Sequence, residues 1–258
     1  MKIQNVKAIV TGGASGLGEA TVRALAAGGG KVAIIDLDQE KGQRLAAELD
    51  RSTFFHRGDV SSDKQIDEVV DKIKRDLGGL NTVINCAGTG GSVKIMGKEG
   101  RMPLEKFTRI LNINLLGTFI VIRATAPSMM ENEPNEEGER GVIINTSSIA
   151  AFDGQIGQSA YSATKGGIVS MTLTHAREFA NNGIRVMTIL PGIMDTPLMK
   201  GLNTDAVRQR LSSQVPFPAR FGKPSEFAHL AIAILENPYL NGEYIRLDGG
   251  LRMGFGRK

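Results

Sequence analysis

The sequence predicts an α/β protein: a single domain built on one doubly wound, mostly parallel sheet of seven strands, with helices on both faces. Three observations lead to this prediction. Short runs that are almost entirely apolar alternate with segments of helical length, a glycine-rich turn follows the first run, and an aspartate ends the second. Strands that are buried on both faces and connected by helices are typical of parallel sheets.

The expected elements alternate regularly along the chain. The apolar runs predict strands at 6–10, 31–36, 52–60, 80–88, 141–148, 184–192 and 243–250. The segments between them have the length and apolar spacing of helices, at 16–28, 39–50, 62–77, 104–126, 159–181 and 224–236. No repeat or linker interrupts this order, so residues 1–258 are expected to form one domain.

Three irregular stretches interrupt the pattern. Residues 89–103 and 191–224 follow the ends of expected strands. Open α/β sheets bind ligands beyond the carboxyl ends of their strands, so we expect these two stretches to shape a pocket. The acidic stretch 131–140 precedes a strand instead, and we expect it to be a solvated surface loop on the opposite edge of the sheet.

The composition is that of a globular protein with no marked preference for a macromolecular partner. Of 258 residues, 41% are hydrophobic, and the net charge of +4 is spread without a basic run, which gives no indication of nucleic-acid binding. Cys86 is the only cysteine, which excludes an internal disulfide and favours a reducing compartment. No uninterrupted apolar run reaches the roughly 18 residues that span a membrane. The first strand pattern starts too early for a targeting segment, so we expect a cytoplasmic protein with no membrane partner and no metal.

A glycine-rich turn joins the first strand to the first helix in "TGGASGLGEA". Gly12, Gly16 and Gly18 are spaced so that the backbone can approach a pyrophosphate at the positive end of the helix. Ser15 and Leu17 belong to the same expected cofactor site. The position of the turn directly after the first strand favours a dinucleotide-binding Rossmann fold over an ordinary tight turn.

Asp36, at the end of the second strand, is the expected anchor for the adenosine ribose. Its carboxylate can accept both ribose hydroxyls, and it would repel a 2′-phosphate. Leu37 follows it, and Ala14 and Ser15 occupy the turn, so no basic side chain stands where an NADP enzyme often has one. The sequence therefore favours NAD over NADP. Asp38 is expected to begin the next helix instead.

The third and fourth strands end in further candidate cofactor residues. Asp59, followed by Val60, can hydrogen-bond the adenine or cap the next helix, and the sequence does not separate these two alternatives. Cys86, Ala87 and Gly88 of "NCAG" lie where the cofactor is expected to cross the sheet. Cys86 is more consistent with a small buried apolar residue than with a reactive thiol.

Ser148, Tyr161 and Lys165 form the expected reacting centre. Ser148 ends the fifth strand, and Tyr161 and Lys165 lie four residues apart on the next helix, so both leave the same face. Hydride transfer at a carbinol carbon requires a partner for the hydroxyl proton. A tyrosine has an ordinary pKa near 10, and a neighbouring cation stabilises its phenolate. Gly166 and Gly167 follow at once and are expected to make room for the sheet or for a helix of a neighbouring subunit.

These motifs together resemble those of the short-chain dehydrogenases/reductases. "TGGASGLG", "NCAG", Asn114 in "NINLLG", Ser148, "YSATK" and "PG" at 191–192 occur in order and at familiar spacing along the whole chain. The resemblance implies a catalytic tetrad of Asn114, Ser148, Tyr161 and Lys165. It also implies that Asn114 kinks its helix and holds a water that relays protons to the lysine. From the residues alone, Asn114 is only a polar residue in an apolar helix.

Two longer stretches are similar to the branch of this family that oxidises 3-hydroxyacyl-CoA. They are "NEPNEEGERGVIINTSSIAAFDGQIGQSAYSATKGGIVSMTL" and "ENPYLNGEYIRLDGGLRM", and the shorter "GIRVMTILPG" and "SQVPFPARFGKPSEFAHL" show the same similarity. The likeness implies reversible, NAD-linked oxidation of a 3-hydroxyl to a 3-ketone in a homotetramer. It implies a substrate site at Ser148, Tyr161 and Gln155, and contacts to the nicotinamide end from Pro191, Gly192, Ile193 and Thr196. Parts of 89–103 and 193–213 depart from the mitochondrial members, which leaves the acyl chain length open.

Two other functions stay open. The same machinery can oxidise a hydroxysteroid or another secondary alcohol, because a pocket rich in Met, Leu, Phe and Pro suits either substrate. A non-enzymatic NAD sensor or scaffold is the alternative from another class, but such a protein need not retain Tyr161 and Lys165. Lys94, Lys98 and Arg101 are candidates to meet a CoA phosphate, although exposed basic residues commonly serve solubility alone.

Overall fold

The computed structural model describes residues 1–49, 52–98, 100–199 and 204–256. Its centre is a seven-stranded sheet in the order β3-β2-β1-β4-β7-β8-β9. All six neighbouring pairs in this sheet are parallel. The chain begins in the middle of the sheet, moves to one edge through β2 and β3, and returns across β1 to fill the other edge. This order confirms the doubly wound α/β fold.

The observed elements follow the expected ones closely. The strands are β1 Lys7–Thr11, β2 Lys31–Asp36, β3 Thr53–Arg57, β4 Thr82–Asn85, β7 Gly141–Thr146, β8 Ile184–Pro191 and β9 Tyr244–Leu247. The main helices are α1 Gly16–Ala27, α2 Gln39–Glu48, α3 Asp63–Leu77, α4 Leu104–Leu111, α5 Gly117–Met130, α6 Ser159–Glu178 and α8 Pro224–Glu236. The strands predicted at 52–60 and 80–88 end three residues early, because 58–60 and 86–88 leave the sheet to line a cavity.

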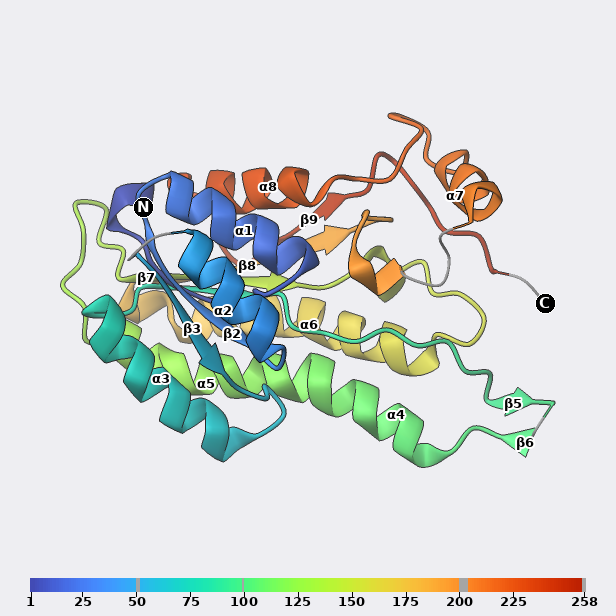
Figure 1. Cartoon of the computed structure of the whole chain (residues 1–258), viewed down its shortest axis with the longest axis horizontal. Helices are drawn as coiled ribbons and strands as arrows, with labels where there is room; N and C mark the ends of the chain where they lie inside the picture. Colours follow the sequence, from blue (N-terminus) through green and yellow to red (C-terminus); the bar gives the residue numbers. More distant parts are fainter. Residues whose placement is uncertain (50–51, 99, 200–203, 257–258) are drawn as a thin grey trace.

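Two of the irregular stretches contain structure of their own. Residues 89–103 carry a short hairpin of β5 Met96–Gly97 and β6 Gly100–Arg101, which projects from the body of the protein (Figure 1). Residues 191–224 include the helix α7 Asp205–Ser212 and a 3₁₀ turn at Pro197–Met199. Residues 200–203 of that stretch, and residue 50 at the end of the second expected helix, lie outside the described residues.

Alternating side chains of the strands bury apolar surface on both faces of the sheet. On one face, Ile9 and Val83 pack with α3 and α5, as shown by the common cluster with Ile73 and Val121. On the other face, Val10 and its neighbours on β1, β2 and β4 pack with apolar residues of α1 and α8, including Val22, Leu25, Phe227 and Leu235. Burial on both faces explains why the strands read as continuous apolar runs.

The long helix expected at 104–126 is interrupted. A π-helical turn at Asn112–Leu116 separates α4 from α5, and Asn114 is completely buried within it. Over its full length, Leu104–Met130 is long and apolar enough to cross a membrane, although charged residues interrupt its apolar sequence. Half of its most apolar 18-residue segment is buried inside the protein, as in the core helix of many globular proteins. The length and composition of this helix are therefore weak support for a membrane span.

Gly167 makes room for a helix of its own chain and not for the sheet. A Cβ atom at this position would lie 3.0 Å from both terminal methyl carbons of Leu115, in the π-helical turn. At Gly166 a Cβ atom would approach only the carbonyl oxygen of Ala151, at 3.9 Å. The expected approach to the sheet is therefore wrong, and Gly167 instead lets α6 pack closely on the interrupted helix.

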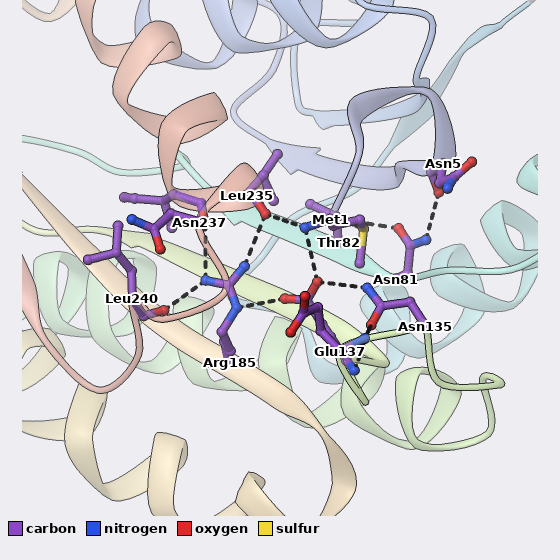
Figure 2. Close-up of polar contacts among 12 residues, drawn as sticks. Met1, Asn5, Asn81, Thr82, Asn135, Glu137, Arg185, Leu235, Asn237 and Leu240 are labelled. Atoms are coloured by element: carbon purple, nitrogen blue, oxygen red, sulfur yellow. Dashed lines mark hydrogen bonds and ion pairs between the residues drawn. The ribbon is translucent and has the colours of Figure 1, made fainter.

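The expectation of a solvated loop at 131–140 is wrong for Glu139. This side chain is buried and accepts a hydrogen bond of 2.6 Å from Nε of Arg185 at the start of β8. Arg185 also donates to the carbonyl oxygens of Ile234, Leu235 and Leu240 around the end of α8, and Figure 2 shows it between this helix end and the acidic stretch. A cation at a helix C-terminus is favourable, and the buried guanidinium needs Glu139 as its counter-charge.

Replacing Glu139 is expected to destabilise the protein. Glu139→Ala leaves the Arg185 guanidinium buried without its carboxylate, and loss of one partner of a buried pair lowers the free energy of unfolding by about 3–5 kcal/mol. Glu136→Ala removes an exposed carboxylate three residues away and should change it by less than about 0.5 kcal/mol. Urea unfolding of both variants at one protein concentration measures the difference. Equal stability of the two variants would contradict the assignment.

Candidate active site

The glycine-rich turn is packed so tightly at Gly12 and Gly18 that a Cβ atom at either position would collide with backbone. A Cβ atom at Gly18 would lie 2.2 Å from the carbonyl oxygen of Gly12. A Cβ atom at Gly12 would lie 2.8 Å from the backbone of Ala87, which follows β4. Ser15 is the N-cap of α1 but makes no side-chain capping bond, so its hydroxyl is not committed to the helix end. The turn therefore brings backbone close to whatever occupies the adjacent cavity.

That cavity has a volume of about 420 Å³ and lies along the carboxyl ends of β1, β2 and β4. The cofactor residues expected from the first half of the sequence all line it, namely Gly12, Ser15, Gly16, Leu17, Gly18, Asp36, Asp59, Val60, Cys86, Ala87 and Gly88. Arg109 of α4 also lines it, and no motif in the sequence pointed to this residue. The expected cofactor residues come from four separate loops, and the parallel sheet places these loops together at the carboxyl ends of its strands.

Asp36 is held in place by backbone donors. One of its carboxylate oxygens accepts a hydrogen bond from the amide of Ala14 in the glycine turn, and the other accepts one from the amide of Asp38, both at 3.0 Å. Each oxygen keeps a further acceptor position, which a pair of ribose hydroxyls can use. Asp38 accepts from the amide of Lys41 and is the N-cap of α2, as predicted.

Asp59 caps the turn before α3. Its carboxylate accepts from both the amide and the hydroxyl of Ser61, at 2.9 and 2.7 Å. The N-cap of α3 is Ser62, so Asp59 acts one turn earlier than a helix cap. Asp59 lines the cavity in this position, and its contact with adenine stays a prediction.

A second cavity of about 290 Å³ contains the expected reacting centre. It is lined by Ser148, Tyr161 and Lys165, and also by Gln155, Pro191, Gly192, Ile193 and Thr196. The two cavities share six lining residues: Leu17, Cys86, Gly88, Thr89, Thr196 and Leu198. They therefore form one continuous groove that runs from the glycine turn to Tyr161.

Burial changes the proton affinities at this centre. Lys165 is buried, its Nζ donates to the carbonyl oxygen of Thr146 at 2.8 Å, and burial lowers its pKa to about 8. Burial raises the pKa of Tyr161, and a side-chain hydrogen bond with Ser148 opposes that effect. Nζ of Lys165 lies 5.7 Å from the centre of the Tyr161 ring. At neutral pH the site thus presents a neutral phenol beside a cation that loses its proton easily.

Asn114 positions the segment that follows β4. Its Oδ1 accepts from the amide of Thr89 at 2.8 Å, and its Nδ2 donates to the carbonyl oxygen of Thr89 at 2.9 Å. A Cβ atom at Gly88 would lie 3.3 Å from Oδ1 of Asn114 and 3.8 Å from Nζ of Lys165. A π-helical turn interrupts the helix at Asn114, and the helix kink itself stays a prediction. Asn114 is thus close to the lysine without lining either cavity, and the water relay stays a prediction.

Cys86 lines both cavities as an unreactive group. Burial raises the pKa of its thiol to about 12, and the Thr146 hydroxyl lies 3.6 Å from its sulfur. A thiol with so high a pKa carries almost no thiolate at neutral pH. This agrees with the interpretation of Cys86 as a small buried residue.

Several pocket residues had no signal in the sequence. They line the second cavity from the segments after β4, β7 and β8, from α7 and from the C-terminal tail: Thr89, Gln158, Leu198, Met199, Leu211, Gln214 and Met253. The position of 89–103 and 191–224 after strand ends predicted that these stretches contribute, and both do. By contrast, Lys94, Lys98 and Arg101 line neither cavity, and their contact with a CoA phosphate stays a prediction.

Removing the buried cation is expected to stabilise the fold. Lys165 is charged at pH 7, although burial lowers its pKa from 10.5 to about 8 in the folded protein. This pKa difference corresponds to a cost to folding of about 3 kcal/mol. Lys165→Met should therefore raise the free energy of unfolding at pH 7, less the loss of the bond to Thr146. Between pH 8 and 10.5 the unfolded chain binds more protons at this group, so wild-type stability rises with pH and the advantage of the variant shrinks.

Urea unfolding at pH 7 and pH 10 checks this expectation. Lys64→Met, which removes an exposed lysine, serves as the control and should be neutral at both values. A Lys165→Met variant that is less stable than the wild type at pH 7 would show that the buried ammonium group does not lower the free energy of unfolding.

Comparison with known proteins places these features in a family. The profile of the short chain dehydrogenase family matches residues 6–207. The chain is 50% identical to 3-hydroxyacyl-CoA dehydrogenase type-2 of Drosophila melanogaster, covering 97% of this chain and 99% of the fly protein. It is 49% identical to the Homo sapiens protein of the same name, covering 97% of each. The crystal structure of 3-hydroxyacyl-CoA dehydrogenase type-2 from Mycobacterium avium matches with a TM-score of 0.91 and 41% identity over 96% of both chains. The chain therefore belongs to the short-chain dehydrogenase family and is an oxidoreductase.

Proposed function

We propose that the protein is an NAD-dependent 3-hydroxyacyl-CoA dehydrogenase that reversibly oxidises the 3-hydroxyl group of its substrate to a ketone. The observation that carries this proposal is the continuous groove, which joins the glycine turn and Asp36 to Ser148, Tyr161 and Lys165. The relatives named 3-hydroxyacyl-CoA dehydrogenase type-2, similar over almost the whole chain, support the substrate class.

The residues of the groove fit NAD. The glycine turn excludes side chains where a pyrophosphate would approach, and Asp36 has acceptor positions for the ribose hydroxyls. Leu37 beside it is exposed and uncharged, so no basic group compensates a 2′-phosphate. Pro191, Gly192, Ile193 and Thr196 would contact the nicotinamide end. NAD⁺, when bound, supplies the acceptor for the hydride.

Tyr161 is the proposed acid/base. In the direction of oxidation its phenolate form accepts the proton of the substrate hydroxyl while the hydrogen on the same carbon departs as hydride, so one proton and one hydride leave the substrate. The Ser148 hydroxyl donates to the substrate oxygen and holds it at Tyr161. The positive charge of Lys165 stabilises the phenolate, which offsets the raised pKa that burial causes. Gln155 would lie beside the substrate chain.

A second candidate function rests on the apolar wall of the pocket. Ile149, Ile193, Met194, Leu198, Met199, Leu211 and Met253 line it, and these side chains suit a steroid or another secondary alcohol as well as an acyl chain. NADH-linked activity on acetoacetyl-CoA, on 3-hydroxyacyl-CoAs of graded length and on a hydroxysteroid separates the two candidates.

We also propose a homotetramer. Leu104, Phe119 and Leu173 are large apolar residues that stay exposed on α4, α5 and α6, and α4 packs against α6. Large apolar residues that stay exposed on helices favour burial against another subunit. Sedimentation velocity measures the assembly directly.

Tyr161→Phe is expected to abolish turnover while it leaves cofactor binding intact. Loss of a general acid/base lowers kcat by about a hundredfold or more. The ring and its packing are retained, so NADH binding measured by fluorescence should stay close to that of the wild type. Tyr239→Phe changes a fully exposed tyrosine and should have wild-type activity. Full activity of Tyr161→Phe would refute the mechanism.

Asp36→Ala is expected to weaken NAD binding and to relax the discrimination against NADP. Removal of the carboxylate eliminates both the acceptor for the ribose hydroxyls and the repulsion of a 2′-phosphate. We expect the ratio of kcat/KM for NAD over NADP to fall by at least about tenfold. Asp38→Ala, which removes the neighbouring helix cap, is the matched control. An unchanged ratio in Asp36→Ala would place the ribose anchor elsewhere.

A further inference from the structure

A network of charged side chains lies behind the substrate end of the pocket. Arg246 of β9 donates to Asp153 at 2.6 Å and to Asp248 at 2.7 Å. It also donates to the carbonyl oxygen of Leu251 at 3.0 Å. The three charged side chains are largely buried, with exposures of 17% for Arg246, 13% for Asp153 and 7% for Asp248. Arg252 also donates to Asp248, at 3.2 Å, and to the carbonyl oxygen of Leu251, at 2.8 Å, but it is mostly exposed and its described contacts do not include Asp153.

Arg246 joins two segments that are remote in the sequence. Asp153 belongs to the connection between Ser148 and Tyr161, and Leu251 belongs to the C-terminal tail. The same two segments are joined again nearer the chain end, where Nε2 of Gln155 donates to the carbonyl oxygen of Gly254 and the amide of Ile156 donates to that of Phe255, both at 3.0 Å. Arg246 therefore lies at one end of the contact between these two segments, and the other end of the contact reaches Gln155 at the pocket.

The tail carries an apolar side chain into the pocket wall. Leu251 is buried in a small cluster with Ile149 and Val215, and Ile193 and Met253 pack against that cluster. Ile149, Ile193 and Met253 all line the cavity that contains Tyr161. The position of the tail therefore sets the distance between Met253 and Gln155, and Gln155 is the residue expected to lie beside the substrate.

The network also touches the cofactor side of the site. A Cβ atom at Gly192 would lie 2.8 Å from both Cα and Cβ of Asp248, so Asp248 packs directly on the segment after β8. A buried ion pair adds little net stability compared with apolar residues of similar volume, because desolvation offsets the attraction. Its specific value here is geometric, since one planar guanidinium fixes Asp153, Asp248 and the tail carbonyl relative to one another.

We propose that Arg246 is a positioning residue that fixes the C-terminal tail, so that Met253 forms the end wall of the pocket and sets the size of substrate that is accepted. This inference rests on the proposed function for the kind of substrate, but the tail contact itself does not depend on it. Arg246 touches neither the reacting atoms nor the groove, and it acts through Asp153 and the tail.

The test compares Arg246→Met, Arg246→Lys, Met253→Ala and the matched control Arg252→Met. Kinetics are measured with 3-hydroxyacyl-CoAs of graded length and with NAD. In Arg246→Met we expect KM for the acyl substrate to rise at least about tenfold, with the preference displaced towards longer chains and KM for NAD changed by less than about twofold. Arg246→Lys retains a cation and should recover part of the effect. Met253→Ala should displace the preference in the same direction, and Arg252→Met should not.

Two results would overturn the proposal. One is a chain-length preference in Arg246→Met equal to that of the wild type. The other is a loss that falls equally on KM for the acyl substrate and KM for NAD, as general destabilisation would produce. Asp153→Asn breaks the same link more mildly and replaces Arg246→Met if that variant does not fold, which circular dichroism reports.

Hydrogen exchange separates failure of this inference from failure of the proposed function. In Arg246→Met the amide of Ile156, which donates to the carbonyl oxygen of Phe255 in the tail, should exchange faster, while Arg252→Met should leave it protected. If the wild type oxidises no 3-hydroxyacyl-CoA, the proposed function fails and the exchange result still decides the tail contact. Unchanged protection in Arg246→Met would refute the positioning role whatever the substrate is.

Discussion

The site depends on the parallel register of the three central strands. Thr11 of β1 is paired with Asn85 of β4, and Asn85 is paired with Asn145 of β7. The carboxyl ends of all three strands therefore lie side by side. Nδ2 of Asn85 donates to Oδ1 of Asn145 at 2.9 Å in the core, and the Thr11 hydroxyl accepts from the amide of Ala87. At this row of polar side chains the chain leaves the sheet three times: into the glycine turn after β1, into residues 86–88 after β4, and into the Ser148 segment after β7. A slip of any strand would separate these parts.

Two buried cations in the protein serve different purposes. Arg185 has a carboxylate and three carbonyl oxygens around it, so its charge is fully compensated. Its hydrogen bonds to these groups join β8 to the end of α8. The contacts described for Lys165 include the carbonyl oxygen of Thr146 and no carboxylate, and its pKa is lowered. An uncompensated charge beside a phenol is unfavourable for the fold, but in the proposed mechanism it is useful for proton transfer, since it stabilises the phenolate that accepts the proton of the substrate.

The two ends of the groove are built in different ways. The end at the glycine turn, where the cofactor is proposed to bind, consists of backbone turns that follow directly from parallel strands, and it tolerates little change because a Cβ atom at Gly12 or Gly18 would collide with backbone. The substrate end is formed by α7, the segments after β7 and β8, and the C-terminal tail, which the Arg246 network joins to the rest. This division lets a family keep its cofactor chemistry while its members differ in substrate, because the substrate wall can change without disturbing the turns.

The sequence by itself determined the alternation of strands and helices, the glycine turn, the acid that ends β2, and the four-residue spacing of Tyr161 and Lys165. These features are local or periodic, so neighbouring residues are enough to reveal them. Only the tertiary structure decided that Glu139 is buried against Arg185, that Asn114 holds Thr89, that Gly167 receives Leu115, and that Met253 reaches the pocket. Each of these depends on a contact between segments far apart in the chain, and nothing in the local pattern of either segment specifies its partner.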